Sequence, residues 1–214
     1  QLLTKFNLPI LLPKDCGEWD EGFISSSDII EIDSSFIINR SISESLDSES
    51  IAKLENKKII ITGAAGSIGS EITRQLNKLS NISLILIDID ESGLHDLFST
   101  LKNKSSCVFH ICDISNLQEL ERVIMKYKGV NSLFHAAAYK HVHIVEIDPY
   151  PAIRVNIQGT LNLCKLVNKY GINDFTLVST DKAVNPTNIM GATKRCAEII
   201  TTYYNYKFKS LYKC

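Results

Sequence analysis

Three glycines, Gly63, Gly66 and Gly69, have the spacing of a phosphate-binding turn. They directly follow an apolar run typical of a buried strand and lead into a helix-like pattern. In such a turn the first glycine permits the tight bend, the second lets a pyrophosphate approach the backbone, and the third lets the helix pack close to the strand. The helix N-terminus offers N–H groups to the phosphates, so Ser67 and Ile68 are also candidate contacts. The motif therefore predicts a dinucleotide site.

An acidic residue lies at the expected distance downstream. Asp88, near the end of the next apolar run, is placed to accept hydrogen bonds from both hydroxyls of an adenosine ribose. Its charge would repel a 2′-phosphate, and residues 88–94 contain no Arg or Lys to offset it, so we predict NAD rather than NADP. Two roles stay open for Asp113, which follows the third apolar run: contact with the adenine edge, or the N-cap of the next helix.

A carboxylate and an ammonium group stand side by side further along the chain. Asp181 and Lys182 follow an apolar segment whose last residue is Thr180. Open parallel sheets bind ligands at the carboxyl ends of their strands, so we expect this strand to aim the pair into the ligand cleft. There the two groups could act as a general acid and a general base. The alternative is a surface ion pair worth less than about 1 kcal/mol.

Strand-like and helix-like segments alternate from residue 57 onward. Short continuous apolar runs, typical of strands buried on both faces, occupy 57–63, 83–90, 107–113, 132–139 and 174–180. Apolar residues at helical spacing follow at 68–79, 116–127 and 151–169, and a further helix is expected to start near residue 190. This order predicts an α/β fold with a Rossmann-type, doubly wound parallel sheet covered on both faces.

Four segments resemble the extended short-chain dehydrogenases/reductases: TGAAGSIG, FHAAAYKHV, VNIQGT and STDKAVNPTNIMGATKR. More narrowly, they are similar to the CapD-type polysaccharide biosynthesis proteins, which are nucleotide-sugar 4,6-dehydratases acting on UDP-N-acetylglucosamine. The resemblance covers roughly residues 57–200. It implies NAD as the cofactor, a UDP-sugar as the substrate, and a homo-oligomer in the full protein.

The sequence departs from the family pattern at one position of the Tyr-x-x-x-Lys pair that the family carries. Lys194 occupies the lysine position, which implies a hydrogen bond to the nicotinamide ribose, but Met190 stands in place of the tyrosine. A thioether carries no proton, so Met190 is expected to fill the space of the phenol and shape the pocket. Asn156 resembles the position that supports this lysine through backbone and water contacts.

Thr180, Asp181 and Lys182 resemble the Thr-Asp-Glu triplet of the dTDP-glucose dehydratases, with a lysine in place of the glutamate. The resemblance implies that Thr180 hydrogen-bonds the C4 hydroxyl, Asp181 protonates the departing C6 hydroxyl and Lys182 takes the C5 proton. Because no phenol is present, we add the hypothesis that Asp181 first acts as the base at O4. The acid role requires desolvation to raise the pKa of Asp181. Lys182 must be neutral to act, and repulsion from Lys194 would favour that form.

Residues of the fourth apolar run complete the expected site. Ala136 and Ala137 keep the side chains small where the cofactor passes. Tyr139 and Lys140 follow at the mouth of the strand, where Lys140 could meet the diphosphate or the sugar of the substrate. His135 lies inside the strand, so we expect a hydrogen-bonded core histidine rather than a ligand.

Composition and charge exclude several classes of function. The formal net charge is −1, which gives no electrostatic reason for binding nucleic acid or an anionic membrane surface. No apolar run approaches the ~20 residues of a membrane helix, and Pro9 and Pro13 interrupt the apolar patch at the start, so no signal peptide is expected. We expect a cytoplasmic protein, or one at the cytoplasmic face of the inner membrane if the full-length protein carries N-terminal membrane helices.

The chain is expected to have two parts. Residues 1–50, rich in Ser and acidic residues, are interpreted as a connector or arm. Residues 51–214 are interpreted as an incomplete NAD-binding domain, and the chain is expected to be a fragment because it begins with Gln1 and stops soon after a helix. The resemblance implies that the missing part is the substrate-binding one, which the family places after the helix that carries Met190 and Lys194. The six cysteines form no Cys-x-x-Cys and no histidine cluster has metal-ligand spacing, so we expect reduced thiols and no metal.

Two other functions stay open beside the dehydratase. An epimerase or reductase would keep the NAD site and Lys194 but would need the tyrosine that Met190 replaces. A catalytically silent NAD-binding module fits Met190 but not the retained Thr180, Asp181 and Lys182. The dehydratase is therefore the function that the sequence favours.

Overall fold

The computed structural model describes residues 10–13, 29–32, 51, 53–208 and 211–214. The chain divides into two compact units, Gln1–Ser50 and Ile51–Cys214. In the first unit, β1 (Ile10–Pro13) and β2 (Ile29–Ile32) pair antiparallel. The interpretation of residues 1–50 as a connector otherwise falls outside the described residues.

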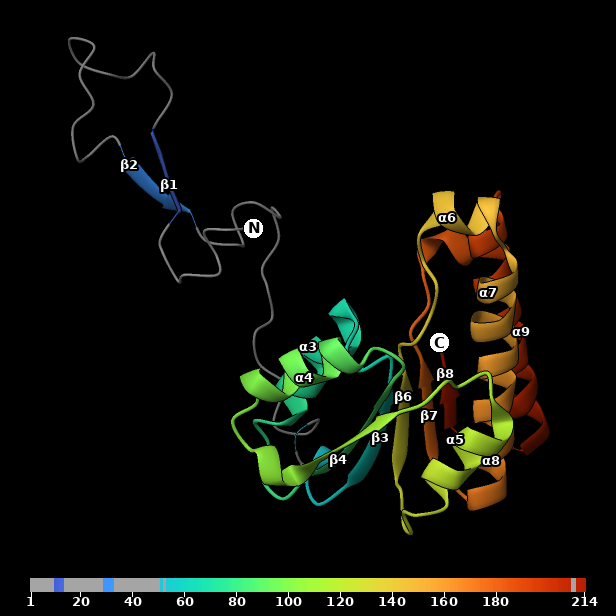
Figure 1. The fold of residues 1–214 in the computed structure, drawn as a ribbon, viewed down its shortest axis with the longest axis horizontal. Coiled ribbons are helices and arrows are strands. Elements are labelled where there is room, and N and C mark those ends of the chain that lie inside the picture. The colour runs from blue at the N-terminus through green and yellow to red at the C-terminus, as the bar shows by residue number, and fades with distance from the viewer. Residues whose placement is uncertain (1–9, 14–28, 33–50, 52, 209–210) are drawn as a thin grey trace. The chain divides into compact units, whose positions relative to one another are not determined.

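The second unit is built on a parallel sheet (Figure 1). Among the described residues six strands lie side by side in the order β5 (Cys107–Ile111), β4 (Ser83–Asp88), β3 (Lys58–Thr62), β6 (Ser132–His135), β7 (Asp174–Leu177) and β8 (Leu211–Lys213). Counted from the strand before the glycine turn, this is the order 3-2-1-4-5-6 of a Rossmann-type sheet. The predicted doubly wound fold is confirmed, and β8 is a strand that the sequence analysis did not predict.

Helices connect the strands. They are α3 (Ser67–Leu76), α4 (Glu91–Thr100), α5 (Leu117–Ile124), α6 (Val142–Ile147), α7 (Tyr150–Ala152), α8 (Thr160–Tyr170) and α9 (Ile189–Phe208). Shorter segments are the 3-10 turns η5 (Lys104–Ser106) and η7 (Asp181–Ala183) and the π-helical η6 (Ile153–Gly159). The helix predicted over 151–169 is therefore three segments, with π-helical turns in its first half.

Side chains alternate between the two faces of the sheet, as the period of a strand requires. Ile59 and Ile61 of β3 pack in a cluster with α3 and α4. Ile60 of the same strand packs with Phe175 of β7 against α5, α8 and α9, which lie on the opposite face (Figure 1). Each of these side chains is fully buried, which stabilises the fold by about 1.5–3 kcal/mol per residue. Burial on both faces explains why the inner strands β3 and β4 read as continuous apolar runs. The same expectation is wrong for β5, which lies at the edge of the sheet and exposes Val108 and Ile111.

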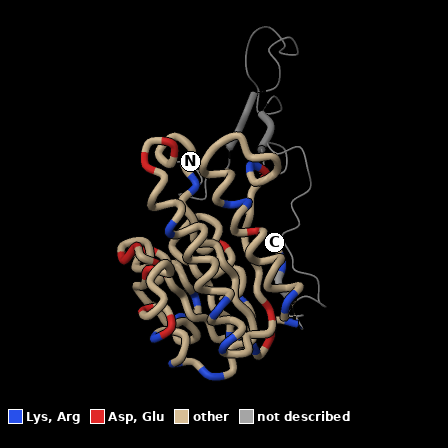
Figure 2. The backbone as a smooth tube through the Cα atoms, turned by 90° about the vertical axis from the view of Figure 1, so that its right-hand side faces the viewer, with Lys and Arg blue, Asp and Glu red and all other residues tan. Residues whose placement is uncertain are grey.

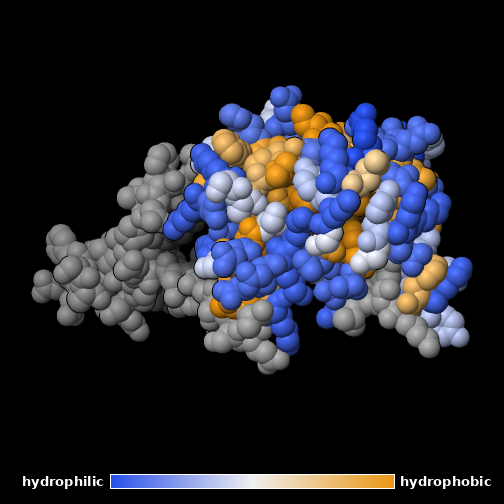
Figure 3. Space-filling model, turned by 90° about the horizontal axis from the view of Figure 1, so that it is seen from below, coloured by the Kyte–Doolittle hydropathy of each residue, from blue (hydrophilic) through white to orange (hydrophobic). Residues whose placement is uncertain are grey.

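The surface of the second unit is mixed in character. Figure 2 shows both basic and acidic positions on the face in view, in keeping with the net charge of −1. In Figure 3 the apolar side chains appear as separate patches between polar ones. No helix in the described part of the chain is long and apolar enough to cross a membrane.

Candidate functional site

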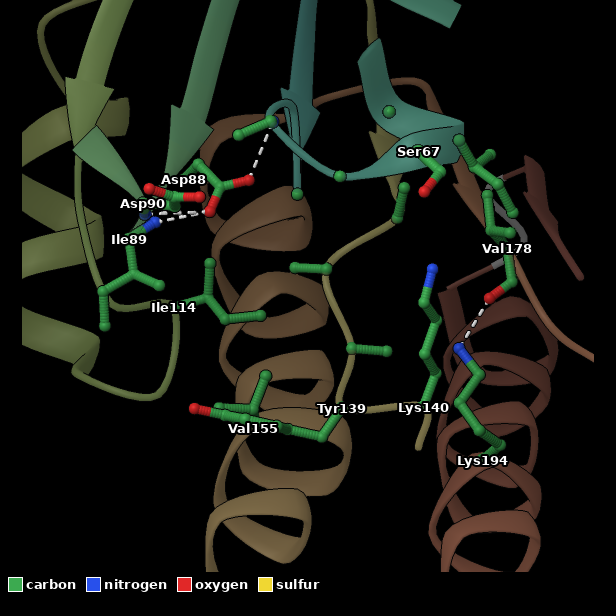
Figure 4. Close-up of a pocket in the computed structure, with 18 of the residues that line it drawn as sticks. Ser67, Asp88, Ile89, Asp90, Ile114, Tyr139, Lys140, Val155, Val178 and Lys194 are labelled. Carbon is green, nitrogen blue, oxygen red and sulfur yellow. Dashed lines mark hydrogen bonds between the residues drawn. The ribbon is translucent and has the colours of Figure 1, made fainter. Parts of the chain in front are cut away.

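A cavity of about 770 Å³ is formed at the carboxyl ends of the strands (Figure 4). The predicted site residues that line it are Gly63, Gly66, Ser67, Ile68, Gly69, Asp88, Asp113, Ala136, Ala137, Tyr139, Lys140, Thr180, Lys182, Met190 and Lys194. Two others, Asn156 and Asp181, do not line it. The cavity includes the turn after β3 and the loop after β6, the two neighbouring strands where the strand order reverses. Doubly wound sheets bind their ligands at this position.

The glycines of the turn meet different constraints. Gly63 has a φ of 71°, in the left-handed region, and a Cβ there would collide with the backbone of Ala137. A Cβ on Gly69 would collide with the carbonyl of Gly63, so this glycine lets α3 pack on the strand as predicted. A Cβ on Gly66 would meet only the Gly63 carbonyl oxygen, at 3.3 Å. This contact is close but far milder than those at Gly63 and Gly69, and a shift of a few tenths of an ångström would relieve it. Gly66 is therefore the glycine of the turn that packing within the chain requires least.

The N-terminus of α3 is available to an anion. Gly66 is its N-cap residue and offers no side-chain acceptor, and the first turn contains no acidic residue. The N–H groups at a helix start have no acceptor within the helix, and a phosphate group can take that place. Ser67, Ile68 and Gly69 all line the cavity at this point. The chain therefore fits the pyrophosphate of a dinucleotide.

The carboxylate of Asp88 ties the end of β4 to the glycine turn. Its Oδ2 accepts from the Ala65 N–H at 2.8 Å, and its Oδ1 accepts from Ile89 N at 2.8 Å and Asp90 N at 3.1 Å (Figure 4). A carboxylate offers about four lone-pair positions. Three are used within the chain, and the contact of Asp88 with the hydroxyls of an adenosine ribose stays a prediction.

Asp113 is not a helix cap, so this alternative is wrong. The N-cap of α5 is Asn116, whose Oδ1 accepts from Glu119 N at 3.2 Å. The Oδ1 of Asp113 instead accepts from the N–H and the hydroxyl of Ser115 at 2.8 and 2.7 Å. Its Oδ2 lies 3.0 Å from a guanidinium nitrogen of Arg154. Asp113 keeps its place in the cavity wall, where the contact with adenine stays a prediction.

Arg154 is a cavity-lining cation that the sequence analysis missed. It lies on η6, and its guanidinium donates to both Asp113 and Ser115 Oγ, the latter at 2.7 Å. Its charge is thus paired with a carboxylate of the same wall. The one available signal was the position of Arg154 in the first turn of the helix predicted over 151–169. That signal was not sufficient, because this segment is π-helical and a π-helical turn changes which residues face the cavity.

Lys194 and Met190 come from the first turns of α9. Lys194 is 6% exposed, and its Nζ donates to the carbonyl of Val178 at 2.6 Å (Figure 4). Burial lowers the pKa of the Lys194 ammonium below its ordinary value, although the carboxylate of Glu198 opposes the shift. Met190 is 3% exposed and packs in a cluster with Val145 of α6. The site therefore holds a buried lysine beside an apolar side chain, where the phenol would stand.

Asp181 and Lys182 occupy η7 and differ in their surroundings. Lys182 lines the cavity, whereas the Asp181 side chain is 89% exposed and does not. The Lys182 Nζ lies 3.7 Å from Asp181 Oδ1, and the Thr180 hydroxyl donates to the same oxygen at 2.9 Å. This hydrogen bond and the lysine charge lower the pKa of Asp181. The predicted upward shift is wrong for the protein without ligands, because the carboxylate is in water.

Gly191 is a second residue that the sequence analysis missed. A Cβ at this position would collide with the backbone carbonyl of Lys182. The first turn of α9 therefore packs directly on η7, and Asn188 Oδ1 holds that turn by accepting from Gly191 N at 2.7 Å. A glycine inside a helix is unfavourable by about 1 kcal/mol relative to alanine, so its place next to Met190 was a signal for a close backbone contact.

Asn156 contacts the walls of the cavity from behind. It is 1% exposed, and its side chain accepts from Tyr139 N at 2.9 Å and donates to Tyr139 O at 3.0 Å. It also donates to Thr193 Oγ1 at 2.9 Å, next to Lys194 in the chain.

His135 is buried with both ring nitrogens in hydrogen bonds, which confirms the expected core histidine.

A doubly wound sheet with a glycine turn, an acid after the second strand and a buried lysine on the helix after the fifth defines the short-chain dehydrogenase/reductase class. Within this class, a family model described as "Polysaccharide biosynthesis protein" matches residues 59–212. The chain therefore belongs to the polysaccharide biosynthesis protein family, and the resemblance to the CapD-type proteins is confirmed.

Relatives with described functions share about a third or more of the aligned residues. The chain is 41% identical over 157 residues to the capsular polysaccharide biosynthesis protein CapD of Staphylococcus aureus, covering 72% of this chain and 26% of that protein. It is 34% identical to a UDP-N-acetylglucosamine 4,6-dehydratase (inverting) of Campylobacter jejuni, and 33% identical to a UDP-glucose 4-epimerase of Rickettsia rickettsii. These matches cover 66% and 67% of this chain, and 42% of each relative. The chain thus spans less than half the length of these relatives.

Solved structures show the same fold. Pen from Bacillus thuringiensis superposes with a TM-score of 0.69 at 28% identity, covering 75% of this chain and 49% of that one. DesIV, a dTDP-glucose 4,6-dehydratase from Streptomyces venezuelae solved with NAD and TYD bound, has a TM-score of 0.63 at 22% identity, covering 73% and 53%. At that identity the second likeness is one of fold.

Proposed function

We propose that this chain is the dinucleotide-binding part of an NAD-dependent nucleotide-sugar 4,6-dehydratase acting on UDP-N-acetylglucosamine. The observation that carries the proposal is the replacement of the phenol by buried Met190, beside a cavity that Lys182 and Lys194 both line. A site without the tyrosine needs other groups to move protons, and η7 supplies a lysine and a carboxylate. The CapD and dehydratase relatives support the same reaction.

In this proposal the contacts run along the whole length of an NAD molecule. The turn around Gly66 would hold the pyrophosphate, Asp88 the adenosine ribose, and Lys194 the nicotinamide ribose. NAD, when bound, would supply the hydride acceptor and donor that a redox-neutral dehydration requires. Asp88 and Asp90 both line the cavity, and their charges disfavour a 2′-phosphate. The charge of Arg154 is already paired with Asp113, which supports NAD rather than NADP.

The proton transfers would be divided between the residues of η7. In the proposal, Asp181 takes the proton of the C4 hydroxyl, which Thr180 orients, and Lys182 in its neutral form takes the C5 proton. Asp181 then passes its proton to the C6 hydroxyl, which leaves as water, and Lys182 returns a proton to C5 when the C5–C6 double bond is reduced, so that both residues end in their starting forms. The lowered pKa of Asp181 keeps the carboxylate ionised, as a base must be, but it also makes the carboxylate a weaker base. The acid role requires the bound sugar to cover η7 and remove this carboxylate from water.

The substrate end of the cavity is cationic. Lys140 lines it together with Lys182 and Lys194, and Figure 4 shows the Lys140 ammonium pointing into the space between the walls. A nucleoside diphosphate sugar carries the complementary negative charge, and we propose Lys140 and Tyr139 as its contacts. The homo-oligomer and the location at the cytoplasmic face of a membrane stay predictions.

The test uses the full-length protein and UDP-N-acetylglucosamine. We expect a product lighter by one water, and a loss of rate of about 100-fold or more for Asp181→Asn and for Lys182→Ala. Lys169→Ala is the matched control, because Lys169 also forms an exposed ion pair, with Glu121, and is not among the cavity-lining residues. Unchanged rates in both η7 variants would contradict the proposed mechanism.

An epimerase is the second candidate, and the relatives named UDP-glucose 4-epimerase favour it. Such an enzyme would return a product of the same mass as the substrate. A catalytically silent NAD-binding module would return the substrate unchanged. The mass measurement therefore separates the dehydratase from the other two functions, and an NMR spectrum of the sugar, which identifies a C4 epimer, separates the epimerase from the silent module.

A further inference from the structure

A series of buried hydrogen bonds runs from the centre of the sheet to η6. Thr62 Oγ1 on β3 lies 2.8 Å from His135 Nδ1 on β6. His135 Nε2 lies 3.1 Å from Thr160 Oγ1, at the start of α8. Thr160 Oγ1 donates to the carbonyl of Asn156 at 2.6 Å. All four residues are at most 1% exposed, so the loss of one partner leaves a buried polar group unsatisfied.

The order of donors and acceptors fixes the tautomer of His135. The hydroxyl proton of Thr160 is used on the Asn156 carbonyl, so the Thr160 oxygen must accept from His135 Nε2–H. The Nδ1 atom then accepts from the hydroxyl of Thr62. This arrangement needs a neutral ring. Burial and the charge of Lys194 lower the pKa of His135 to about 3, which keeps the ring neutral.

The series continues from η6 to α9. Asn156 Nδ2 donates to Thr193 Oγ1 at 2.9 Å, and Thr193 Oγ1 donates to the Met190 carbonyl at 2.7 Å. Thr193 is 3% exposed and precedes Lys194 directly. The same Asn156 side chain also forms two hydrogen bonds with the backbone of Tyr139. One buried amide thus connects the loop after β6 to the turn that carries Lys194.

We propose that His135 and Thr160 are positioning residues for Lys194. They hold η6 against the sheet, and through Asn156 and Thr193 they keep the Lys194 ammonium buried beside the Val178 carbonyl. Buried polar networks specify geometry when every member is satisfied, and no buried side-chain nitrogen or oxygen among the described residues lacks a partner. The inference rests on the proposed function only for the use made of Lys194, since the position of its ammonium is a property of the chain itself.

The test follows the titration of Lys194 in the full-length protein without ligands. Lysines labelled with ¹³C at the ε-carbon are observed by NMR, and the resonance is assigned with Lys194→Arg. Thr160→Val removes the hydroxyl with little change of shape. We expect the pKa of Lys194 to rise toward that of an exposed lysine by about half a pH unit or more, because the ammonium gains access to water. Thr160→Ser, which keeps the hydroxyl, should titrate like the wild type.

Thr73→Val is the matched control. Thr73 is equally buried, and its hydroxyl donates to the carbonyl four residues earlier at 2.8 Å, as Thr160 does, but it is outside the network. It should leave the Lys194 titration unchanged. If Thr160→Val does not fold, Thr62→Val breaks the network at its far end and should shift Lys194 in the same direction.

If Lys194 keeps its wild-type pKa in a folded Thr160→Val or Thr62→Val protein, the inference is overturned. An equal shift of the Lys194 pKa in Thr73→Val would also overturn it. If the wild-type protein fails to dehydrate the sugar nucleotide, that result contradicts the proposed function but does not affect the Lys194 titration, which needs no substrate. The two failures are therefore distinguishable.

Discussion

The glycine turn shows how single residues of one motif carry different constraints. A Cβ on Gly69 collides with the Gly63 carbonyl, whereas one on Gly66 meets the chain only at 3.3 Å. We predict that Gly66→Ala weakens NAD binding and lowers the free energy of unfolding less than Gly69→Ala does. Gly69→Ala should reduce both the NAD affinity and the free energy of unfolding, the latter by about 1–3 kcal/mol because of overpacking. Calorimetric NAD titration and urea unfolding measure the two effects, and wild-type NAD affinity in Gly66→Ala would contradict the assignment of this turn.

Lys194 is placed at a cost in stability. Burial lowers the pKa of Lys194 in the folded state below its ordinary value of 10.5. At a pH between the folded-state pKa and 10.5, the unfolded chain therefore binds more protons than the folded one. Stability due to this group therefore rises with pH through that window and is reduced below it. We predict that Lys194→Met raises the free energy of unfolding at pH 7 while lowering activity about 100-fold or more. Urea unfolding at pH 7 decides this, and a less stable variant would contradict the stated burial penalty.

Residue identity alone predicted much of the site and failed at particular positions. The glycines, Asp88, Lys182 and Lys194 all line the cavity, because a motif tied each to the end of a strand or the start of a helix. The exposure of Asp181 was not predictable from its neighbours. The strand was expected to run to residue 180, but β7 ends at Leu177, so the alternation of a strand no longer sets the direction of this side chain.

At the scale of elements, long apolar runs were predictable and short or irregular segments were not. The strands of the sheet interior are marked by continuous apolar residues, because both of their faces are buried. The edge strand β8 has three residues and no such pattern. The change from α7 to π-helical η6 was equally hidden, because apolar spacing does not distinguish the two kinds of turn over seven residues. That change determines where Arg154 and Asn156 lie.

The contact between α9 and η7 leads to a prediction at this scale. Gly191→Ala would push the Lys182 carbonyl away from α9. Because small displacements of reacting groups are costly, we expect the rate of dehydration to fall about 10-fold or more while NAD affinity stays near the wild-type value. Ala192→Gly is the control, since it perturbs the same helical turn at an exposed position. A wild-type rate in Gly191→Ala would show that this contact does not place Lys182.

At the scale of the whole molecule, the proposed dinucleotide site lies within one unit. Every residue that lines the cavity lies between Gly63 and Lys194, within Ile51–Cys214. We predict that deleting residues 1–50 leaves the dissociation constant for NAD within about twofold of the wild-type value, a change of under ~0.5 kcal/mol. Fluorescence titration of both proteins with NAD measures this. A loss of NAD binding in the deletion variant would place part of the site in the first unit.

In the proposed mechanism, groups of η7 take the place of a catalytic phenol and move protons at O4, C5 and O6 of the sugar. The most direct measurement is the mass of the product when the full-length protein acts on UDP-N-acetylglucosamine in D₂O, followed by exchange back into H₂O. Proton removal and return at C5 predicts a product lighter by one water that retains one carbon-bound deuterium. A product with the mass of the substrate and no carbon-bound deuterium would contradict the dehydratase.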